Sequence, residues 1–336
     1  MKFKNLLLII IIATLTFSCA KPNDPAKENN VLKIFNILET GGYAYDFDVS
    51  DELLFAAEDQ RGFSIHNLVS GSMYCHVDTL FDDFPNPFEN VRKIAGSVDD
   101  DILIVYERYG NPAALNIYDI SDPFIPEWKT QNISQTSDVQ KILLTENQNN
   151  DLEIFWTNDN SLNIATYNNT WTNEATIDLP NTTGGSSVQG FDFNQDLFVV
   201  AGSQFGVHII DRNTDELILT YDTIGEAVDV KLVDNLAYIA LWEEGYLLLD
   251  ITDPADPIEI HQENVGENIY TVDVKNNKMV LSSHTGGVLL FDVLDDTEPV
   301  LLGNLRESDI GYTYKANFEG DHIIASTRTG IIIIEY

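Results

Sequence analysis

Short apolar runs alternate with polar turns along most of the chain. The clearest stretch is residues 227–265, whose pattern predicts four strands: Ala227–Val233, Leu236–Leu241, Gly245–Asp250 and Pro257–Asn264. An Asp-Asn turn, a short loop and an Asp-Pro turn separate them. Short strands joined by such turns form an antiparallel meander. The same order returns over residues 44–67 and 271–292.

The third strand of each meander carries a recurring phrase, Gly-apolar-x-apolar-apolar-Asp. Seven copies, three of them weaker, begin at residues 62, 114, 161, 206, 245, 287 and 330. They lie 39–52 residues apart, which is the size of a four-stranded propeller blade. The pattern therefore predicts an all-β, seven-bladed β-propeller of four-stranded antiparallel blades.

Two copies continue into a matching corner, "GYLLLDITDPADP" at 245–257 and "LNIYDISDPFIP" at 115–126. The aspartates are expected to accept hydrogen bonds from local backbone N–H groups, and proline then fixes φ for the turn into the outer strand. No further calcium-ligand series follows these acids. We interpret them as structural corners.

The unit "AVDV", "LAYIAL", "GYLLLDITDPADP" resembles the LVIVD repeat, a propeller repeat of exported bacterial proteins. The resemblance covers roughly residues 40–336 and is strongest in blades 1, 4, 5, 6 and 7. Blades 2 and 3 depart from it, since "SLNIATYNNTWTNEATIDL" at 161–179 lacks the Asp-Pro corner. The resemblance implies the propeller fold and little chemistry, because the repeat has no general catalytic residues.

The ends of the chain complete one another. The last repeat stops after its third strand, Gly330–Tyr336, while a spare strand, Val31–Ile37, stands near the amino terminus. An unpaired outer edge is an aggregation hazard. We expect Val31–Ile37 to pair with Gly330–Tyr336 as the outermost strand of the last blade. The alternative is an open or six-bladed ring in which residues 130–185 form an insertion.

The first 30 residues lie outside this pattern. Lys2 and Lys4 precede an apolar stretch from Leu6 to Phe17 that is too short to span a bilayer stably. Ser18-Cys19 resembles the lipobox of bacterial lipoproteins, which implies cleavage after residue 18 and acylation of Cys19. An ordinary signal peptide with a coincidental cysteine is the alternative. We divide the chain into a signal peptide (1–18), a lipidated cysteine with a flexible tether (19–30) and the propeller (31–336).

Charge narrows the range of partners. The chain has 18 basic and 54 acidic residues, a formal net charge of −36, and the signal peptide carries two of the lysines. A body this acidic repels phosphate backbones and anionic lipid, so nucleic acid is excluded as a partner. The lipid bilayer is reached through Cys19 instead. Of the chain's two cysteines, Cys75 remains, and we interpret it as a small buried apolar residue.

No catalytic motif stands out. The chain has no Gly-x-Ser-x-Gly elbow, HExxH, phosphate loop or dinucleotide fingerprint. The six histidines are scattered over different predicted strands, without metal-ligand spacing. We therefore assign no catalytic residue, metal or cofactor.

Loops offer a candidate binding face. The loops between second and third strands are expected to surround one mouth of the channel, and they hold Arg61, Arg108 and Arg328; Arg306 lies in the blade 6–7 connection. These are four of six arginines, all on blades 7, 1 and 2 or beside them. Arginine suits the forked recognition of carboxylate or phosphate. The same face should carry the aromatic residues Tyr109, Phe205, Trp242, Phe81, Phe84 and Phe88.

The simpler interpretation, which the sequence favours, is that each arginine neutralises a neighbouring acid, as Glu58, Asp59 and Glu107 invite. Three functions compete: a non-enzymatic interaction platform that binds an envelope protein or an anionic ligand, a surface glycan-binding protein, and a propeller hydrolase or lyase. A flat aromatic strip would favour glycan binding, and two close carboxylates, one with a raised pKa, would favour an enzyme. Ala20 and Lys21 lack the Asp that retains lipoproteins at the inner membrane, which predicts the outer membrane.

Overall fold

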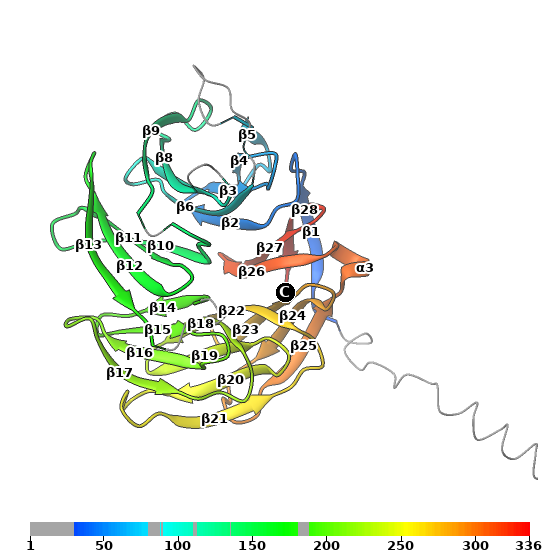
Figure 1. The fold of residues 1–336 in the computed structure, drawn as a ribbon. Helices are drawn as coiled ribbons and strands as arrows, with labels where there is room; N and C mark the ends of the chain where they lie inside the picture. Colours follow the sequence, from blue (N-terminus) through cyan, green and yellow to red (C-terminus); the bar gives the residue numbers. More distant parts are fainter. Residues whose placement is uncertain (1–29, 80–87, 89, 110–112, 135, 181–187) are drawn as a thin grey trace, which may run out of the picture.

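The structure, a computed structural model, describes residues 30–79, 88, 90–109, 113–134, 136–180 and 188–336. Seven four-stranded antiparallel sheets stand around a common axis as the blades of a propeller (Figure 1). The predicted fold is thus confirmed. Cys19, Phe81 and Phe84 lie outside the described residues.

In blades 1–6 the strands follow one another in chain order from the axis to the rim. The strands of blades 1–3 are β2 (Asp46–Ser50), β3 (Leu53–Ala57), β4 (Phe63–Asn67), β5 (Met73–Val77); β6 (Val91–Ser97), β7 (Ile102–Glu107), β8 (Ala114–Asp119), β9 (Glu127–Asn132); and β10 (Lys141–Glu146), β11 (Leu152–Thr157), β12 (Ser161–Tyr167), β13 (Trp171–Asp178). Those of blades 4–6 are β14 (Phe191–Phe193), β15 (Leu197–Ala201), β16 (Val207–Asp211), β17 (Glu216–Tyr221); β18 (Ala227–Val233), β19 (Leu236–Leu241), β20 (Gly245–Asp250), β21 (Ile258–Glu263); and β22 (Ile269–Lys275), β23 (Lys278–Ser283), β24 (Gly287–Asp292), β25 (Val300–Leu305).

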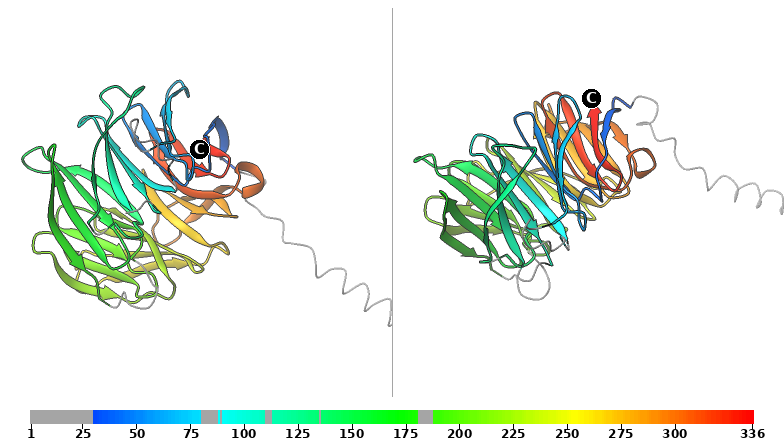
Figure 2. Two further views of the ribbon diagram at one scale, coloured as in Figure 1. Left: turned by 45° about the horizontal axis from the view of Figure 1, so that its top comes forward. Right: turned by 90° about the horizontal axis from the view of Figure 1, so that it is seen from above.

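Blade 7 joins the two ends of the described chain. It contains β26 (Thr313–Glu319), β27 (His322–Thr327), β28 (Gly330–Glu335) and, at the rim, β1 (Lys33–Leu38). β1 runs antiparallel to β28, with Lys33 opposite Glu335 and Leu38 opposite Ile331. Figure 2 shows the blue first strand beside the carboxy terminus in both views. The predicted closure is confirmed, and the six-bladed alternative is wrong because β10–β13 form a complete blade.

The core of the protein lies in the seams between neighbouring blades. One seam packs Phe55 and Phe63 of blade 1 against Leu103 and Val105 of blade 2, and all four side chains are fully buried. The other seams are built in the same way from the alternating apolar residues of adjacent sheets. Each blade therefore depends on both neighbours, and the ring is stabilised as a whole.

The Asp-Pro corners are built as predicted. In blade 5, Asp250 Oδ1 accepts a hydrogen bond from Thr252 N at 2.8 Å, and Asp253 Oδ1 accepts one from Ala255 N at 3.1 Å. Blade 2 repeats the geometry with Asp119 and Asp122. These acids are occupied as turn caps, which accounts for the recurrence of the phrase.

The glycine that opens the phrase has a steric cause. Gly287 has φ +75°, and a Cβ there would lie 1.8 Å from Leu305 O in the outermost strand. Gly266 has the same φ, but no atom lies within 4 Å of its Cβ position. The first glycine is required by both dihedral angle and contact, the second by dihedral angle alone.

Replacing these two glycines separates the two effects. Gly266→Ala is expected to lower the free energy of unfolding by about 1 kcal/mol through backbone strain alone. Gly287→Ala is expected to lower it by more than about 3 kcal/mol, because the outer strand must also move. Urea unfolding of both variants measures the difference, and equal losses would contradict this account of the repeated glycine.

A single helical turn, α3 (Glu307–Ile310), lies in the connection between blades 6 and 7 (Figure 1). Arg306 precedes it, and its backbone N–H donates to Asp309 Oδ2 at 2.9 Å. Among the described residues, no helix has both the length and the apolar character needed to cross a bilayer.

Candidate functional site

A pocket of about 480 Å³ lies on the propeller axis. Every blade contributes residues of its innermost strand, from Asp46 in β2 to Lys315 in β26. Loops between second and third strands add Arg108, Trp242 and His284, so the pocket is one mouth of the central channel. Its volume falls in the range of small-molecule sites, about 300–1,000 Å³.

Aspartates of the innermost strands connect neighbouring blades. Each accepts a hydrogen bond from a backbone N–H in the innermost strand of the next blade. The pairs are Asp46 with Ile94, Asp48 with Gly96, Asp192 with Leu232, Asp229 with Val272, and Asp273 with Phe318, at 2.8–3.3 Å. These carboxylates have a structural role, because they satisfy buried backbone donors along the channel wall.

Basic residues are concentrated in this pocket. Six of the chain's 18 lysines and arginines line it, namely Arg92, Lys93, Arg108, Lys141, Lys231 and Lys315. Three of the lysines are matched to channel aspartates: Lys315 Nζ lies 2.8 Å from Asp46 Oδ1, Lys141 Nζ lies 2.8 Å from Asp229 Oδ1, and Lys231 Nζ lies 3.7 and 3.5 Å from Asp192 and Asp273. Arg108 pairs with Asp138 at 2.6 Å.

The Lys141–Asp229 pair spans the width of a blade. It joins blade 3 to blade 5 past Gly190, which precedes the innermost strand of blade 4. A Cβ on Gly190 would lie 2.2 Å from Asp229 Oδ1. Glycine at this position therefore makes room for the ion pair.

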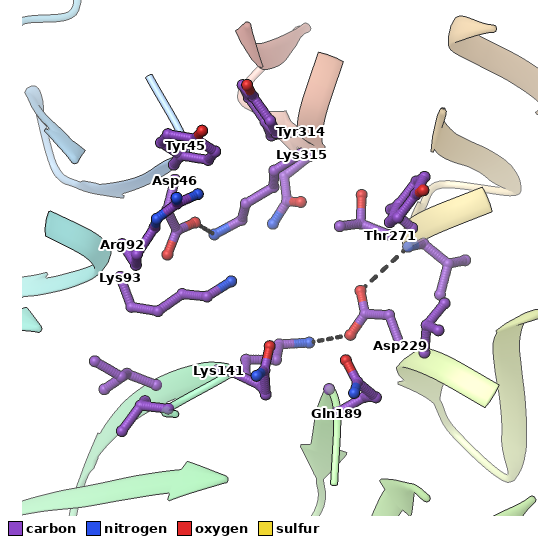
Figure 3. Close-up of a pocket in the computed structure, with 18 of the residues that line it drawn as sticks. Tyr45, Asp46, Arg92, Lys93, Lys141, Gln189, Asp229, Thr271, Tyr314 and Lys315 are labelled. Carbon is purple, nitrogen blue, oxygen red and sulfur yellow. Dashed lines mark hydrogen bonds and ion pairs between the residues drawn. The ribbon is translucent and has the colours of Figure 1, made fainter. Parts of the chain in front are cut away.

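Lys93 is the exception among these cations. Its side chain makes no hydrogen bond or ion pair with any described residue, and its ammonium points into the pocket between the Lys315–Asp46 and Lys141–Asp229 pairs (Figure 3). Burial lowers the pKa of Lys93; Asp46 raises it, and the positive charge of Lys315 lowers it further. Among the described cations of the pocket, Lys93 is thus the one without an ion-pair partner.

Aromatic residues line one half of the pocket mouth. The residues of this aromatic arc are Trp242, Tyr270, His284, Tyr312, Tyr314 and Tyr45, which follow one another from blade 5 through blades 6 and 7 to blade 1. All of them except Tyr312 line the pocket. Trp242 Nε1 donates to Tyr270 OH at 3.1 Å, and ring centroids are 3.4 Å apart for Tyr270–His284 and 4.3 Å for Tyr314–Tyr45. The arc joins rings that are far apart in sequence into a continuous wall.

Arg92 extends the arc into blade 2. Its guanidinium lies 3.6 Å from the ring centroid of Tyr45, which is a cation–π contact. Its Nε donates to Asn90 Oδ1 and lies 3.9 Å from Asp59 Oδ1, whereas neither Nη atom makes a hydrogen bond with the described residues. Within the arc, burial and then Arg328 lower the pKa of His284 to about 4, so this ring is neutral at pH 7.

Asp48 is the channel carboxyl with a clearly displaced titration. Burial raises its pKa to about 6, against the opposing effect of Lys315. The folded protein therefore binds this proton more tightly than the unfolded chain does. The resulting penalty is absent below about pH 4, grows as the pH rises towards 6, and is complete above that value.

Asp48→Asn is expected to remove this penalty and keep the acceptor for Gly96 N. The variant should be more stable than the wild type at pH 8 by about 1–3 kcal/mol and equally stable at pH 4. Urea unfolding at the two pH values measures both. Asp51→Asn in the exposed β2–β3 turn is the control; a gain at pH 8 in both variants, or in neither, would contradict the assignment.

The predicted site residues divide into two groups. Arg108 and Trp242 line the pocket. Arg61, Tyr109, Phe205, Arg306 and Arg328 are not among its lining residues. Tyr109 is 59% exposed, beside Arg108, and Phe205 is half-buried in the β15–β16 loop. Whether these residues bind a ligand stays a prediction.

Arg61 and Arg328 both contact the connection between β1 and β2, at Gly41 and Tyr43. Arg61 Nε donates to Gly41 O at 3.4 Å. Arg328 lies over Tyr312 and Tyr43, at 4.1 and 5.7 Å from the ring centroids, and its Nε donates to Tyr314 OH at 3.2 Å. Arg108 has an acidic partner of the kind that the simpler interpretation expects, and that partner is Asp138, where the sequence suggested Glu107.

Phe88 corrects one prediction. It is 2% exposed and packs edge-on against Phe63, so it belongs to the seam between blades 1 and 2 and adds no surface to the mouth. Cys75 is half-buried against the same seam. Burial raises the pKa of its thiol to about 11, which agrees with a structural apolar role.

Sequence reasoning missed most of the pocket. Most of its side chains come from the innermost strands or from the residues just before them. They include Arg92, the four channel lysines and most of the aromatic arc. A signal was present, because "YDFDV", "AVDVK" and "TVDVK" place charges in the middle of otherwise apolar strands. Such charges are expensive to bury unless they face a channel or a partner.

The LVIVD-repeat family model matches residues 224–264, which contain blade 5. No curated protein matches the chain in sequence. Three similar solved structures are "Structure of U3-55K", with TM-score 0.71, 14% identity and coverage of 91% of this chain and 98% of that one; "Crystal structure of RRP9 WD40 repeats", with 0.71, 14%, 93% and 98%; and "Crystal Structure of Mitotic Checkpoint Complex", with 0.70, 12%, 94% and 98%. At these identities the likeness extends to the fold.

Proposed function

We propose that the protein is a non-enzymatic binding platform of the bacterial outer membrane, anchored by lipid on Cys19, which binds its ligand at the mouth of the central channel. The anchor rests on the amino-terminal sequence. The binding face rests on one observation, the axial pocket where basic and aromatic side chains of a very acidic chain come together. A rigid ring with loops around such a pocket suits recognition.

The carboxylates of the pocket argue against an acid–base enzyme. Asp46 and Asp48 both line it, and the pKa of Asp48 is raised. Both oxygens of Asp46 are engaged, however, by Lys315, Phe47 N and Ile94 N, and Asp48 accepts from Gly96 N. A catalytic pair must be able to exchange protons with a substrate. These two carboxylates instead accept hydrogen bonds from residues of the channel wall.

The aromatic arc favours the second candidate, glycan binding. Five of its members line the pocket and are half-buried, namely Tyr45, Trp242, Tyr270, His284 and Tyr314. Half-buried tyrosine and tryptophan supply both apolar ring surface and hydrogen-bonding groups. This combination suits a ligand with apolar C–H faces and many hydroxyls, which supports a glycan as one candidate ligand of the platform.

Site-specific photo-crosslinking in whole cells tests the binding face. A photoreactive residue at Tyr109, on the rim of the mouth, is expected to give discrete adducts, while one at Ile258, which is 64% exposed on the outer strand of blade 5, is not. Adducts from Ile258 and none from Tyr109 would move the binding face to the blade edges.

The anchor has its own test. Cys19→Ala is expected to release the protein from the membrane fraction and to abolish fatty-acyl mass on the mature amino terminus. Cys75→Ala, which removes the other cysteine, should change neither result. Wild-type protein that is cleaved without acylation would show an ordinary signal peptide instead.

A further inference from the structure

The lining of the pocket is nearly balanced in charge but unevenly paired. It contains the six cations named above and seven acids, Asp46, Asp48, Asp138, Asp192, Glu226, Asp229 and Asp273. Five of these acids accept interblade backbone N–H groups, and four of those five also adjoin a lysine. Of the remaining two acids, Asp138 pairs with Arg108 at 2.6 Å and Glu226 accepts a hydrogen bond from Ser203 Oγ at 3.4 Å. Each of the seven acids therefore has a partner in the wall.

Lys93 is left over from this pairing. The charges that act on it are those of Asp46, Lys315, Asp229 and Lys141, and each of these belongs to a pair with a 2.8 Å contact. Figure 3 shows the Lys93 side chain extending between the two pairs into open space. A half-buried ammonium without an acceptor costs free energy, and a bound anion would remove that cost.

We infer that the channel mouth binds a monoanionic sugar whose carboxylate is held by Lys93. This rests on the proposed function, because it names the ligand class of the same binding face. Arg92, beside Lys93 and with its Nη atoms unengaged by described residues, is the second donor for the carboxylate. The pair offers a point charge and a planar fork to one anion.

The unpaired charge of the channel wall indicates the charge of the ligand. The single unpaired ammonium of Lys93 matches one negative charge. A dianion such as a phosphate monoester would add a second charge to a lining in which acids already outnumber bases by seven to six, and like charges at this range repel. The pocket therefore favours a carboxylate over a phosphate.

The neutral part of the ligand follows from the remaining lining. Tyr45, Tyr314 and Trp242 give ring surface on one side, and Gln140, Gln189 and Asn317 give amide groups on others. Hydroxyl groups can donate to or accept from all of these. A pyranose ring with a carboxylate at C6 satisfies both the amides and Lys93.

The test uses three sugars that differ at C6: glucuronate, glucose and glucose 6-phosphate. Each is titrated into the mature chain, wild type, Lys93→Met, Lys93→Arg and Lys33→Met, and binding is followed by calorimetry. Lys33 is exposed on β1, so its variant makes the same change in net charge far from the pocket. The wild type and Lys33→Met are expected to bind glucuronate at least about tenfold more tightly than the other two sugars.

Lys93→Met should lower glucuronate affinity to that of glucose while leaving glucose affinity unchanged, and Lys93→Arg should retain most of the preference. Lys93→Met should also raise the urea midpoint, because it removes an unpaired buried charge. Unchanged glucuronate affinity in Lys93→Met, or tighter binding of glucose 6-phosphate, would overturn the inference. Adducts at Tyr109 without binding of any sugar would overturn the ligand class and leave the binding face intact.

Discussion

A chain that begins at residue 39 is expected to lose the closed ring. Without β1 the outer edge of β28 is unpaired, and the buried side chains of Leu32 and Leu38 disappear from the seams on either side of blade 7. Each buried leucine contributes about 2–3 kcal/mol, and the lost strand ladder adds to this. The free energy of unfolding should fall by at least about 5 kcal/mol, which is comparable to the whole stability of many domains.

Urea unfolding and size-exclusion chromatography measure this loss, since an exposed sheet edge also promotes self-association. The matched control begins at residue 30. It keeps Asn30, whose side chain bonds both the N–H and the carbonyl of Asn304, and it should unfold at the same midpoint as the chain from residue 19. Equal midpoints for the chains from residues 30 and 39 would mean that β1 does not close the ring.

Asp229→Ala is expected to be the most damaging single substitution in the channel. It removes the acceptor for Val272 N and the counter-ion of Lys141, and Asp229 is 6% exposed. Breaking a buried pair from one side costs about 3–5 kcal/mol, because a charge is left without its partner. Asp253→Ala, which removes an exposed corner cap in the same blade, should cost about 1 kcal/mol.

A double variant separates the ion pair from the backbone bond. Lys141→Met combined with Asp229→Ala should recover part of the loss, because the unpaired ammonium is gone while Val272 N still lacks its acceptor. Thermal or urea unfolding of the four proteins gives the coupling. A loss for Asp229→Ala no larger than that for Asp253→Ala would show that the pair does not stabilise the ring.

The fold was predictable because the sequence pattern of a blade occurs seven times along the chain. Strands Ala227–Val233, Leu236–Leu241 and Gly245–Asp250 have the predicted limits, and β1 differs from the predicted Val31–Ile37 by a shift at its ends. Repetition makes a weak local signal strong, since each copy supports the others. Blade 3 lacks the Asp-Pro corner, so only its spacing along the chain predicted it as a blade. Its four strands follow from the alternation of its apolar residues.

The pocket was less predictable because its residues meet only when the ring is closed. Lys93, Lys141 and Lys315 come from blades 2, 3 and 7, and nothing in the local pattern says that they share a space. Arg108 and Trp242 lie in loops and were predicted, whereas the pocket residues of the innermost strands were not. A buried side chain in a propeller can face either a seam between blades or the central channel. The alternation of apolar and polar residues in the sequence does not distinguish these two environments.

Stability and recognition oppose one another at Lys93. The other channel lysines strengthen the ring: burial lowers the pKa of Lys315 and of Lys231, but neighbouring aspartates raise it by more. Lys93 differs from Lys231 and Lys315 in that its pKa is lowered. Exceptions to the rule that buried charges are paired are expected at functional sites. Lys93 is such an exception in the channel.

The most direct measurement is the pKa of Lys93 itself, by NMR titration of the protein with ¹³C-methylated lysines and assignment through Lys93→Arg. The account predicts a pKa below the ordinary 10.5 in the free protein and an upward shift when glucuronate is added. A pKa at or above 10.5 without ligand would mean that Lys93 already has a counter-ion, and the channel mouth would then have no free charge to offer.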